Sequence, residues 1–579
     1  MRWGDGDLRW VRPLHGIVAL LGEAIVPVEI DGIASGATTV GHRFHHPGAI
    51  TIGGASDYVE KLRACHVIVD QEERERIVRD GAAAAAKKAK LTLLADEGLV
   101  VENAGLTEWP VPLVGRFDAD FLDVPREVIV LTMRTNQKYF ACTNDQGLLA
   151  PAFVCVANIA ANDGGEAIAE GNARVLAARL ADARFFWEQD LKVPLEEQAK
   201  KLGGIVFHEK LGTVADKVER VAKLARWLVE SGVIRTDVVE AERAARLAKA
   251  DLVTGMVGEF PELQGVIGGY LAEAQGEPKA VADAIRDHYG TPPQPASAAI
   301  ALADKLDTIC AFFGIDLKPT GSKDPLALRR AAIASIELIV GNGLRLNLTE
   351  AVRGALANRA GQLKDPGPAH RLDRTVPGIL EFFADRLKVQ QREAGVRHDL
   401  IDAVFALGGE DDLVRLLARV KALQGFVETE DGADLLTAHK RAANILKKEN
   451  WTGGVLSSPA EDGIPQTGEE DPLVLVDDPI VGQAVAEMAS GHTGADLPQE
   501  KALIAALDKA EPRASGAIEK EEFTAAMAAL ASLRGPIDDF FDHVTVNDPD
   551  PAKRERRLNL LMRFRDAVNR VADFSKIEG

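Results

Sequence analysis

The chain has 579 residues, 46% of them hydrophobic and 27% charged, which is the composition of a globular protein with enough material for several cores. The formal net charge of −20 excludes a protein whose whole surface binds nucleic acid, although screening over about 8–10 Å leaves room for a local basic surface. The apolar stretches stop well short of the roughly 20 residues that a membrane span needs, and four scattered cysteines without a CxxC pair indicate reduced thiols in a cytoplasmic protein.

The first third of the chain is predicted to be a mixture of strands and helix. A segment rich in helix formers predicts one helix over residues 71–98. Short apolar or β-branched runs bounded by Gly, Asp and Pro predict strands on both sides of it. These predicted strands are residues 16–21, 24–30, 49–52, 126–133, 138–144 and 152–159.

The rest of the chain has a helical pattern almost to its end. Residues 210–230 place six apolar side chains on one face at the spacing of an amphipathic helix. Residues 322–340 predict another helix, with Asp324 as N-cap and Pro325 at the first helical position. Residues 452–480 hold many Gly, Pro and acids and no basic residue, which predicts a loop. The six apolar residues of the first of these helices are Leu211, Val214, Val218, Val221, Ala225 and Leu228.

A basic segment, residues 553–579, ends the sequence. It holds eight Lys or Arg and four acids, a local net charge of +4 in a molecule of −20. Arg556, Arg563 and Arg570 are seven residues apart and share one face of a helix, where guanidinium groups suit bidentate contact with phosphate. The other interpretation is a solvated face paired with nearby acids. The candidate phosphate-binding residues are Lys553, Arg554, Arg556, Arg557, Arg563 and Arg570.

A histidine and two acids in the middle of the chain form a second candidate site. His208, Asp251 and Asp304 occur in an order that resembles the HD superfamily, whose members hold a divalent metal that activates water. In that superfamily a histidine precedes the first acid, and here the position is Ala250. The three residues are therefore either a weakened metal site or the remnants of a degenerate one, bonded to helix ends and arginines. We expect the second, and no metal in this chain.

Three further histidines lie close together in residues 41–52. His42, His45 and His46 could bind zinc, but no Cys or acid with matching spacing accompanies them, so a polar turn is expected. The sequence has no GxxxxGK[ST] phosphate loop, no GxGxxG after a strand and no nucleophile elbow. No catalytic residue is therefore predicted in this chain.

Several long motifs in a fixed order point to a family. The chain resembles the β subunit of the bacterial heterotetrameric glycyl-tRNA synthetase, and the resemblance covers nearly all of it. The motifs include "GHRFHHPGAITI" at 41–52, "REVIVLTMRTNQKYFA" at 126–141 and "KADLVTGMVGEFPELQGVIGGYLA" at 249–272. Further motifs lie at residues 1–15, 171–198, 202–220, 319–332 and 540–577.

This resemblance implies a tRNA-binding subunit of glycine–tRNA ligase whose aminoacylation site lies on another chain. The α subunit would bind ATP with Mg²⁺ and activate glycine, and the two chains would form a cytoplasmic α2β2 heterotetramer that attaches glycine to tRNA(Gly). The six candidate residues of the basic segment would then contact tRNA. Two other functions stay open here: an HD-type metal-dependent phosphohydrolase and a non-enzymatic RNA-binding protein.

The implied fold is α+β, with a mixed α/β portion followed by a mostly helical remainder. The expected domains are a mixed α/β domain, an HD-like helical domain without a complete metal motif, a helical connector, and a helical-bundle anticodon-binding domain that contains the 452–480 loop. Family members usually carry a segment upstream of "MRWG", so the first domain is expected to be truncated. The expected boundaries are 1–170, 171–340, 341–400 and 401–579.

Overall fold

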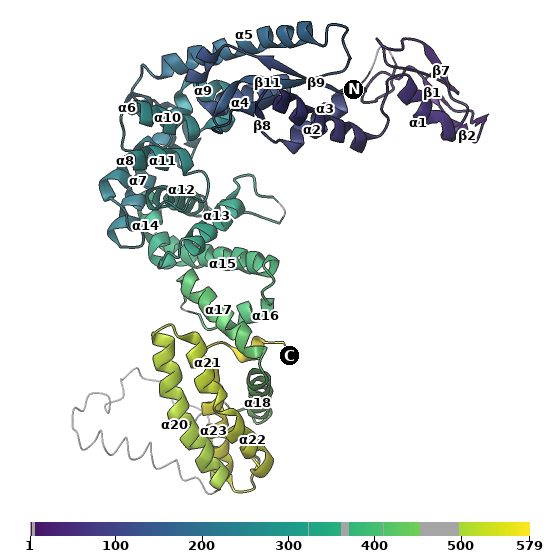
Figure 1. Ribbon diagram of the computed structural model, residues 1–579. Coiled ribbons are helices and arrows are strands. Elements are labelled where there is room, and N and C mark those ends of the chain that lie inside the picture. Colours follow the sequence, from purple (N-terminus) through teal and green to yellow (C-terminus); the bar gives the residue numbers. More distant parts are fainter. Residues whose placement is uncertain are drawn as a thin grey trace. The chain divides into compact units, whose positions relative to one another are not determined.

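The structure is a computed structural model, and its helices and strands are drawn in Figure 1. The chain divides into two compact units. The first unit combines residues up to 202 with residues 247–282, and the second combines residues 203–246 with those from 283 onward. The first holds the larger sheet and the second is almost entirely helical, so the predicted α+β class is confirmed. Among the described helices, none is long and apolar enough to cross a membrane. The described residues are 2, 6–321, 323–360, 370–408, 410–451 and 497–578.

Short strands fill the beginning of the first unit. They are β1 (Ile17–Val18), β2 (Leu20–Leu21), β3 (Ala24–Ile25), β4 (Glu29–Ile30), β5 (Ile33–Gly36), β6 (Thr38–Val40) and β7 (Ala49–Thr51). They pair as a three-stranded sheet in the order β1-β5-β4 and as two pairs, β2 with β3 and β6 with β7. Ile50 and Ile52 pack with Leu62 of helix α1 (Ala55–Ala64) in a small core. The three strand segments predicted here are confirmed by β1 to β4 and β7.

A four-stranded antiparallel sheet forms the centre of the first unit. Its order is β8 (Thr92–Leu93), β10 (Phe140–Thr143), β11 (Leu149–Ala157) and β9 (Val111–Arg116). Because side chains alternate along a strand, Ala152 and Val154 of β11 join the core with α2 (Gln71–Lys88) and α3 (Glu97–Leu106). Cys155 points the other way, where its sulfur accepts a hydrogen bond from Asn172 of α5 (Glu166–Asp190). The predicted strands 138–144 and 152–159 are confirmed.

One close approach in this sheet depends on a glycine. Gly115 of β9 lies opposite Phe153 of β11, and the fully buried Phe153 ring stacks on Tyr139 with the ring centroids 4.6 Å apart. A Cβ atom at position 115 would stand 2.2 Å from the Cζ atom of Phe153. The position therefore requires glycine because no space is left for a side chain.

Residues 126–133, predicted as a strand, instead form a helix. α4 (Arg126–Leu131) continues into the π-helical turn η2 (Thr132–Gln137). Val128, Ile129 and Met133 are fully buried. A short apolar run fits a buried helix as well as a strand, and this ambiguity is why the strand prediction was wrong.

The helix predicted over 71–98 is split in two. α2 ends at Lys88, Lys90 adopts a left-handed backbone with φ of 62°, and strand β8 follows. Asp96 then starts α3 by accepting a hydrogen bond from the amide of Leu99 at 2.9 Å. Leu93 of β8 packs against the sheet core. This tertiary packing favours a strand at residues whose intrinsic propensity favours a helix. The remaining elements with all residues in this unit are η1 (Ala119–Asp123), α6 (Leu195–Lys201), η4 (Ala250–Val253), α9 (Gly255–Glu259), η5 (Pro261–Leu263) and α10 (Val266–Ala274).

Helix α12 (Pro295–Phe313) is the centre of the second unit. Almost all of its residues are buried, because α7 (Val214–Glu230), α13 (Leu328–Gly341) and α14 (Leu348–Ala360) pack against it. The helix predicted over 210–230 begins at Val214, so Leu211 lies before it rather than on its apolar face. Leu211 and the other five apolar residues of that prediction are buried. The other elements of this part of the chain are η3 (Leu202–Gly204), β12 (Val206–His208), β13 (Gly212–Thr213), α8 (Val238–Leu247), α11 (Lys279–Asp287) and α15 (His370–Glu393).

The helix predicted over 322–340 starts later than expected. It begins at Leu328, after Ala327, whose φ of 54° is left-handed. Asp324 is therefore not the N-cap, and Pro325 is not the first helical residue. Asp324 still holds the helix start, because its two carboxylate oxygens accept the amides of Leu328 and Arg329, each at 2.9 Å.

The C-terminal part of the second unit consists of packed helices. The segment predicted to be basic and helical over 553–579 is helical as far as Asn569. The loop predicted at 452–480 lies outside the described residues, and the four expected domain boundaries stay predictions. The helices are α16 (His398–Phe405), α17 (Leu413–Val427), α18 (Glu430–Lys448), α20 (Pro498–Glu519), α21 (Phe523–Ala531), α22 (Arg534–His543), α23 (Pro551–Asn569) and η7 (Phe574–Lys576).

The close approach at Gly115 gives a test of the sheet. Gly115→Ala is expected to destabilise the protein by about 1–3 kcal/mol, because the new methyl group overlaps the Phe153 ring in a packed core. Adding Phe153→Leu should remove part of that cost, so the two changes should not be additive. Gly105→Ala on α3, where no atom lies within 4 Å of the new Cβ, is the control. Thermal unfolding of all four variants measures this, and a fully additive double variant would contradict it.

Candidate nucleic-acid interface

Asp251 is a buried acid that holds the start of a helix. Its side chain is completely buried, and its Oδ2 atom accepts hydrogen bonds from the backbone amides of Gly265 and Gly268. Those amides belong to the first turn of α10 and its cap, where a carboxylate is favoured by the helix dipole. Burial raises the pKa of Asp251 to about 6, although the two amides act in the opposite direction. The Asp251 carboxylate thus has a structural role within the first unit, where it holds the start of α10.

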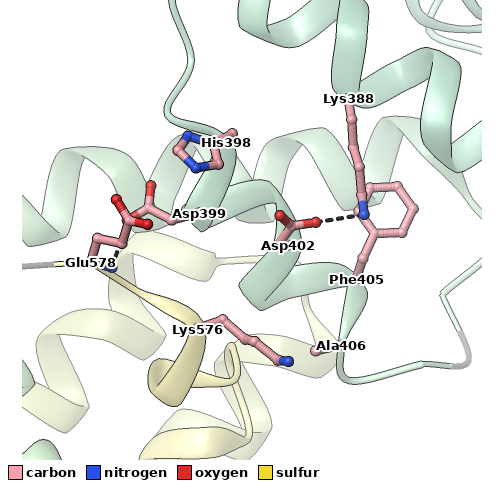
Figure 2. A pocket seen from close by; sticks show the side chains of 8 residues that line it. All are labelled: Lys388, His398, Asp399, Asp402, Phe405, Ala406, Lys576 and Glu578. Carbon is pink, nitrogen blue, oxygen red and sulfur yellow. Dashed lines mark hydrogen bonds and ion pairs between the residues drawn. The ribbon is translucent and has the colours of Figure 1, made fainter.

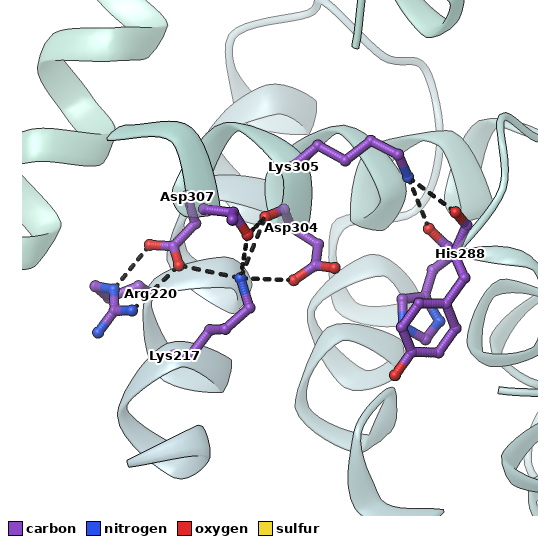
Figure 3. Close-up of polar contacts among 8 residues, drawn as sticks. Lys217, Arg220, His288, Asp304, Lys305 and Asp307 are labelled. Atoms are coloured by element: carbon purple, nitrogen blue, oxygen red, sulfur yellow. Dashed lines mark hydrogen bonds and ion pairs between the residues drawn. The ribbon is translucent and has the colours of Figure 1, made fainter. Parts of the chain in front are cut away.

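Asp304, the second acid, is bonded to a lysine in the second unit. The Nζ atom of Lys217 lies 2.9 Å from the Asp304 carboxylate. The same ammonium donates to Thr308 at 2.7 Å and lies 3.4 Å from Asp307. Figure 3 shows the lysine extending from α7 into this group of oxygens on α12. The Asp304 charge is therefore compensated by an internal cation.

Asp307 joins Lys217 to a second buried cation. The Nε atom of Arg220 donates to Asp307 at 2.7 Å, and its Nη2 atom donates at 3.2 Å. Only 1% of the Arg220 side chain and 2% of the Asp307 side chain are exposed. Removing one member of a buried pair leaves an uncompensated charge in a low-dielectric interior. The network thus ties α7 to α12.

A buried lysine holds the turn before α12 in the same region. Lys305 Nζ donates to the backbone carbonyls of His288 and Tyr289 at 3.1 and 3.4 Å (Figure 3). It also donates to the carbonyl of Gly290 at 2.8 Å. Carbonyl oxygens at a chain turn lack helical partners, and an ammonium with three donors satisfies several at once. The polar side chains of this region therefore serve the fold.

His208 has local partners of its own. Its Nδ1 atom accepts the backbone amide of Lys210, and its ring packs edge-on against Phe312 with centroids 5.5 Å apart. Phe312 is eight residues along α12 from Asp304, a rise of about 12 Å. Among the described residues, no group of three His, Cys, Asp or Glu could hold a metal ion. The geometry gives His208, Asp251 and Asp304 separate local roles.

The histidines near residue 45 fasten a turn to a distant strand end. His42 is fully buried; its Nδ1 atom accepts the amides of Phe44 and His45, and its Nε2 atom lies 2.6 Å from the carbonyl of Asn158. His45 accepts the amide of Ala160 at 3.1 Å. Burial and then the neighbouring imidazoles of His66 and His42 lower the pKa of His45. These ring nitrogens have backbone partners, as the polar-turn interpretation expects.

Two candidate arginines, Arg563 of α23 and Arg570 at the end of this helix, bond to side chains of α20. Arg563 donates to Glu511 at 2.9 Å and to Asp508 at 2.7 Å, and Arg570 donates to Ser515 at 2.6 Å. All three partners belong to α20. The predicted Arg stripe is thus, at these two positions, part of the contact between α20 and α23.

Other candidates of the same helix also have internal partners. Arg557 is 5% exposed and bonds to Glu500 and Asp548, each at 2.6 Å. Arg554 pairs with Glu449 at the end of α18. Lys553 and Arg556 are partly exposed and engaged as well. Contact of these six residues with tRNA stays a prediction, and for Arg557 the structure shows a buried structural role.

A cavity of about 520 Å³ lies beside α15, α16 and η7 (Figure 2). Lys388 pairs with Asp402 at 2.5 Å and lies 5.4 Å from the centroid of the Phe405 ring. Asp399 accepts the amide of Glu578 at 2.8 Å. Two lysines and three acids line the cavity, so it offers no surplus positive charge to a phosphate-rich ligand.

The sequence reasoning missed a basic surface on α18. Lys440, Arg441, Lys447 and Lys448 lie on the solvent side of this helix, opposite the buried Leu435, Ala442 and Leu446. We call these four residues the α18 basic face. The available signal was the run "KRAANILKK" at 440–448, which has four cations and no acid. The run lies between the family motifs at 319–332 and 540–577 and belongs to neither.

Comparisons with known proteins cover almost the whole chain. The family model described as glycyl-tRNA synthetase beta subunit matches residues 1–406, and the DALR anticodon binding domain matches residues 480–575. The glycine–tRNA ligase beta subunit of Rhodospirillum centenum is 49% identical over 612 residues, covering 100% of this chain and 80% of the relative. Those of Paracoccus denitrificans and Phenylobacterium zucineum are each 46% identical with the same coverage.

The raised pKa of Asp251 predicts a pH-dependent stability difference. Its folded pKa of about 6 lies above the ordinary value of 3.8, so the folded state binds more protons between pH 4 and 6. Stability from this group is therefore highest below pH 4 and is lost as the pH rises through 6. Relative to Asp251→Asn, the wild type should lose up to about 3 kcal/mol between pH 4 and pH 7. Thermal unfolding of both proteins across this range measures it; a constant difference would contradict the assignment.

The buried network predicts unequal effects for two acidic residues. Asp307→Ala should destabilise the protein by about 3–5 kcal/mol, because the buried cations Arg220 and Lys217 both lose the Asp307 carboxylate. Glu230→Ala breaks an ion pair with Arg226 in which both side chains are about half exposed, and should cost less than about 0.5 kcal/mol. Denaturant unfolding of the two variants checks this. Equal losses of unfolding free energy in the two variants would show that the buried ion pair matters no more to stability than the exposed one.

Proposed function

Because this chain belongs to the glycyl-tRNA synthetase beta subunit family, we propose that it is the tRNA-binding β subunit of a glycine–tRNA ligase. With its partner subunit it converts ATP, glycine and tRNA(Gly) to glycyl-tRNA(Gly), AMP and diphosphate. The observation that carries this proposal is the match over residues 1–406, together with relatives at 43–49% identity that cover the whole chain. The match to the DALR anticodon binding domain supports tRNA binding.

Glycine–tRNA ligases use ATP for aminoacylation, and we assign the ATP and its Mg²⁺ to the α subunit. In the first step the glycine carboxylate attacks the α-phosphate of ATP and diphosphate leaves. In the second, a ribose hydroxyl of the tRNA attacks the glycyl carbonyl, and AMP leaves. In this assignment the present chain supplies no group to either step and contributes by holding the tRNA. The absence of phosphate-loop motifs from the sequence is consistent with it.

The partner in this proposal is an α subunit in an α2β2 complex that works in the cytoplasm, where aminoacyl-tRNA is consumed by translation. The contacts of the chain with tRNA would come mainly from the C-terminal helices, which include the segment matched to the DALR domain. For the alternative phosphohydrolase function, a metal ligand would have to be available at Asp304. Lys217 already pairs with that carboxylate, so we do not favour that function.

Activity assays of the separate and combined chains test the proposal. The purified chain alone should give no glycine-dependent exchange between ATP and diphosphate, and should bind tRNA(Gly) with affinity that falls steeply as salt rises. Adding the α subunit should give glycyl-tRNA(Gly). Glycine activation by the isolated chain, or an α–β mixture that binds tRNA(Gly) but never charges it, would contradict the proposal.

A further inference from the structure

We infer that the α18 basic face, Lys440, Arg441, Lys447 and Lys448, is a surface that binds the phosphate backbone of tRNA. This inference rests on the proposed function and adds a helix that neither family match includes, because the matches end at residue 406 and resume at residue 480. The observations that carry it are the charge of the face, the partners of the surrounding cations, and the fixed position of one arginine.

The α18 basic face has a surplus of positive charge. Arg441, Lys447 and Lys448 are exposed, and Lys440 is partly exposed. In the part of the chain that the structure describes, no carboxylate forms an ion pair with any of the four. Glu449, the acid next to them in sequence, is engaged by Arg554. A polyanion that approaches this face therefore meets cations whose charge is not already cancelled.

Several arginines in the same group of C-terminal helices are, by contrast, already paired with carboxylates. Arg557 bonds to Glu500 and Asp548, and Arg563 bonds to Asp508 and Glu511. Arg534 at the other end of α18 is held by acids of the first turn of that helix. For these arginines a phosphate would have to displace an existing carboxylate. On the second half of α18, by contrast, four cations without a carboxylate partner among the described residues lie together on one face.

Helix stability alone does not explain the face. Lysines in the last turn of a helix are favoured by the helix dipole, and this covers Lys447 and Lys448. Lys440 and Arg441 lie about two turns earlier, where the dipole effect has faded. Four cations extending over more than two turns fit the spacing of successive phosphates along a nucleic-acid strand better than they fit a helix cap.

Arg441 is held in position by an aromatic ring. Its guanidinium carbon lies 4.4 Å from the centroid of Phe541 on α22 and its Nη2 atom donates to the Phe541 carbonyl at 3.4 Å. A guanidinium stacked on a ring has fewer conformations to lose on binding. It also keeps donors and one planar face for a phosphate or an unstacked base. Because the whole chain carries −20, such a local cationic surface is needed to overcome general repulsion of RNA.

A pair of matched lysine variants tests the inference in the α–β complex. Lys447→Ala with Lys448→Ala removes a Lys-Lys pair from the last turn of α18, and Lys87→Ala with Lys88→Ala removes the same pair from the last turn of α2. All four lysines are exposed, so both variants lose the same charge at the same place in a helix. Binding to a tRNA(Gly) transcript is measured at 50 and 200 mM salt, and thermal unfolding confirms that each variant is folded.

The α18 variant should show a flatter salt dependence. Each phosphate contact contributes about 0.7–0.9 to the slope of log K against log salt. Loss of two contacts should make the slope shallower by about 1.4–1.8, so the fourfold rise in salt weakens wild-type binding about tenfold more than binding by the variant. The α2 variant should retain the wild-type slope. Lys440→Ala with Arg441→Ala should act in the same direction as the α18 variant.

Three results would overturn the inference and are distinguishable from failure of the proposed function. If both α18 variants bind tRNA(Gly) with the wild-type slope, the face does not contact RNA, although the chain still can. If the α2 and α18 variants lose the same slope, the effect is one of net charge only. If the α18 variants bind tRNA but no longer co-purify with the α subunit, the face is a protein contact. A wild-type complex that neither binds nor charges tRNA(Gly) would instead refute the proposed function.

Discussion

A buried charge must find a partner inside the protein, and the second unit is organised by this requirement. Taking an ion out of water costs several kcal/mol, which an opposite charge and hydrogen bonds have to offset. Asp307 forms ion pairs with Arg220 and Lys217, and Lys217 forms a further ion pair with Asp304. Through these contacts α7 and α12 are fixed by specific polar bonds in addition to apolar packing. Asp304 occupies the sequence position of a metal ligand in the HD superfamily, and in this structure the Lys217 ammonium lies beside it instead.

The same requirement separates structural cations from available ones in the C-terminal helices. Arg557 and Arg563 form ion pairs with acids of α20 and of the loop before α23. Their positive charge is therefore largely neutralised by contacts that stabilise the bundle. The four residues of the α18 basic face form no ion pair with a carboxylate among the described residues. Charge that is not compensated internally is what a polyanion can use. A count of basic residues in the sequence is therefore a poor guide to an RNA-binding surface. The structure is a better guide, because it shows which basic side chains lack an acidic partner within the protein.

The sequence predicted the α+β class. It predicted the amphipathic helix α7 from the three-and-four spacing of apolar residues, and the strands β10 and β11 from short runs rich in apolar and β-branched residues. It misassigned residues 126–133, where a short apolar run has no decisive period. The family motifs correctly indicated what the chain is related to. They could not show that Arg563 faces α20 or that Lys217 reaches Asp304, because these contacts join residues 52 and 87 positions apart. Pairing of charges is a property of the packed structure.

The central claim is that tRNA meets the cations that the fold leaves uncompensated. Lysine acetylation of the α–β complex, with and without tRNA(Gly) and read by mass spectrometry, tests this directly. We expect tRNA(Gly) to protect Lys440, Lys447 and Lys448, while Lys200 on α6, which is exposed but paired with Glu197, keeps its reactivity. Protection of Lys200 with unchanged reactivity of the three α18 lysines would contradict the account.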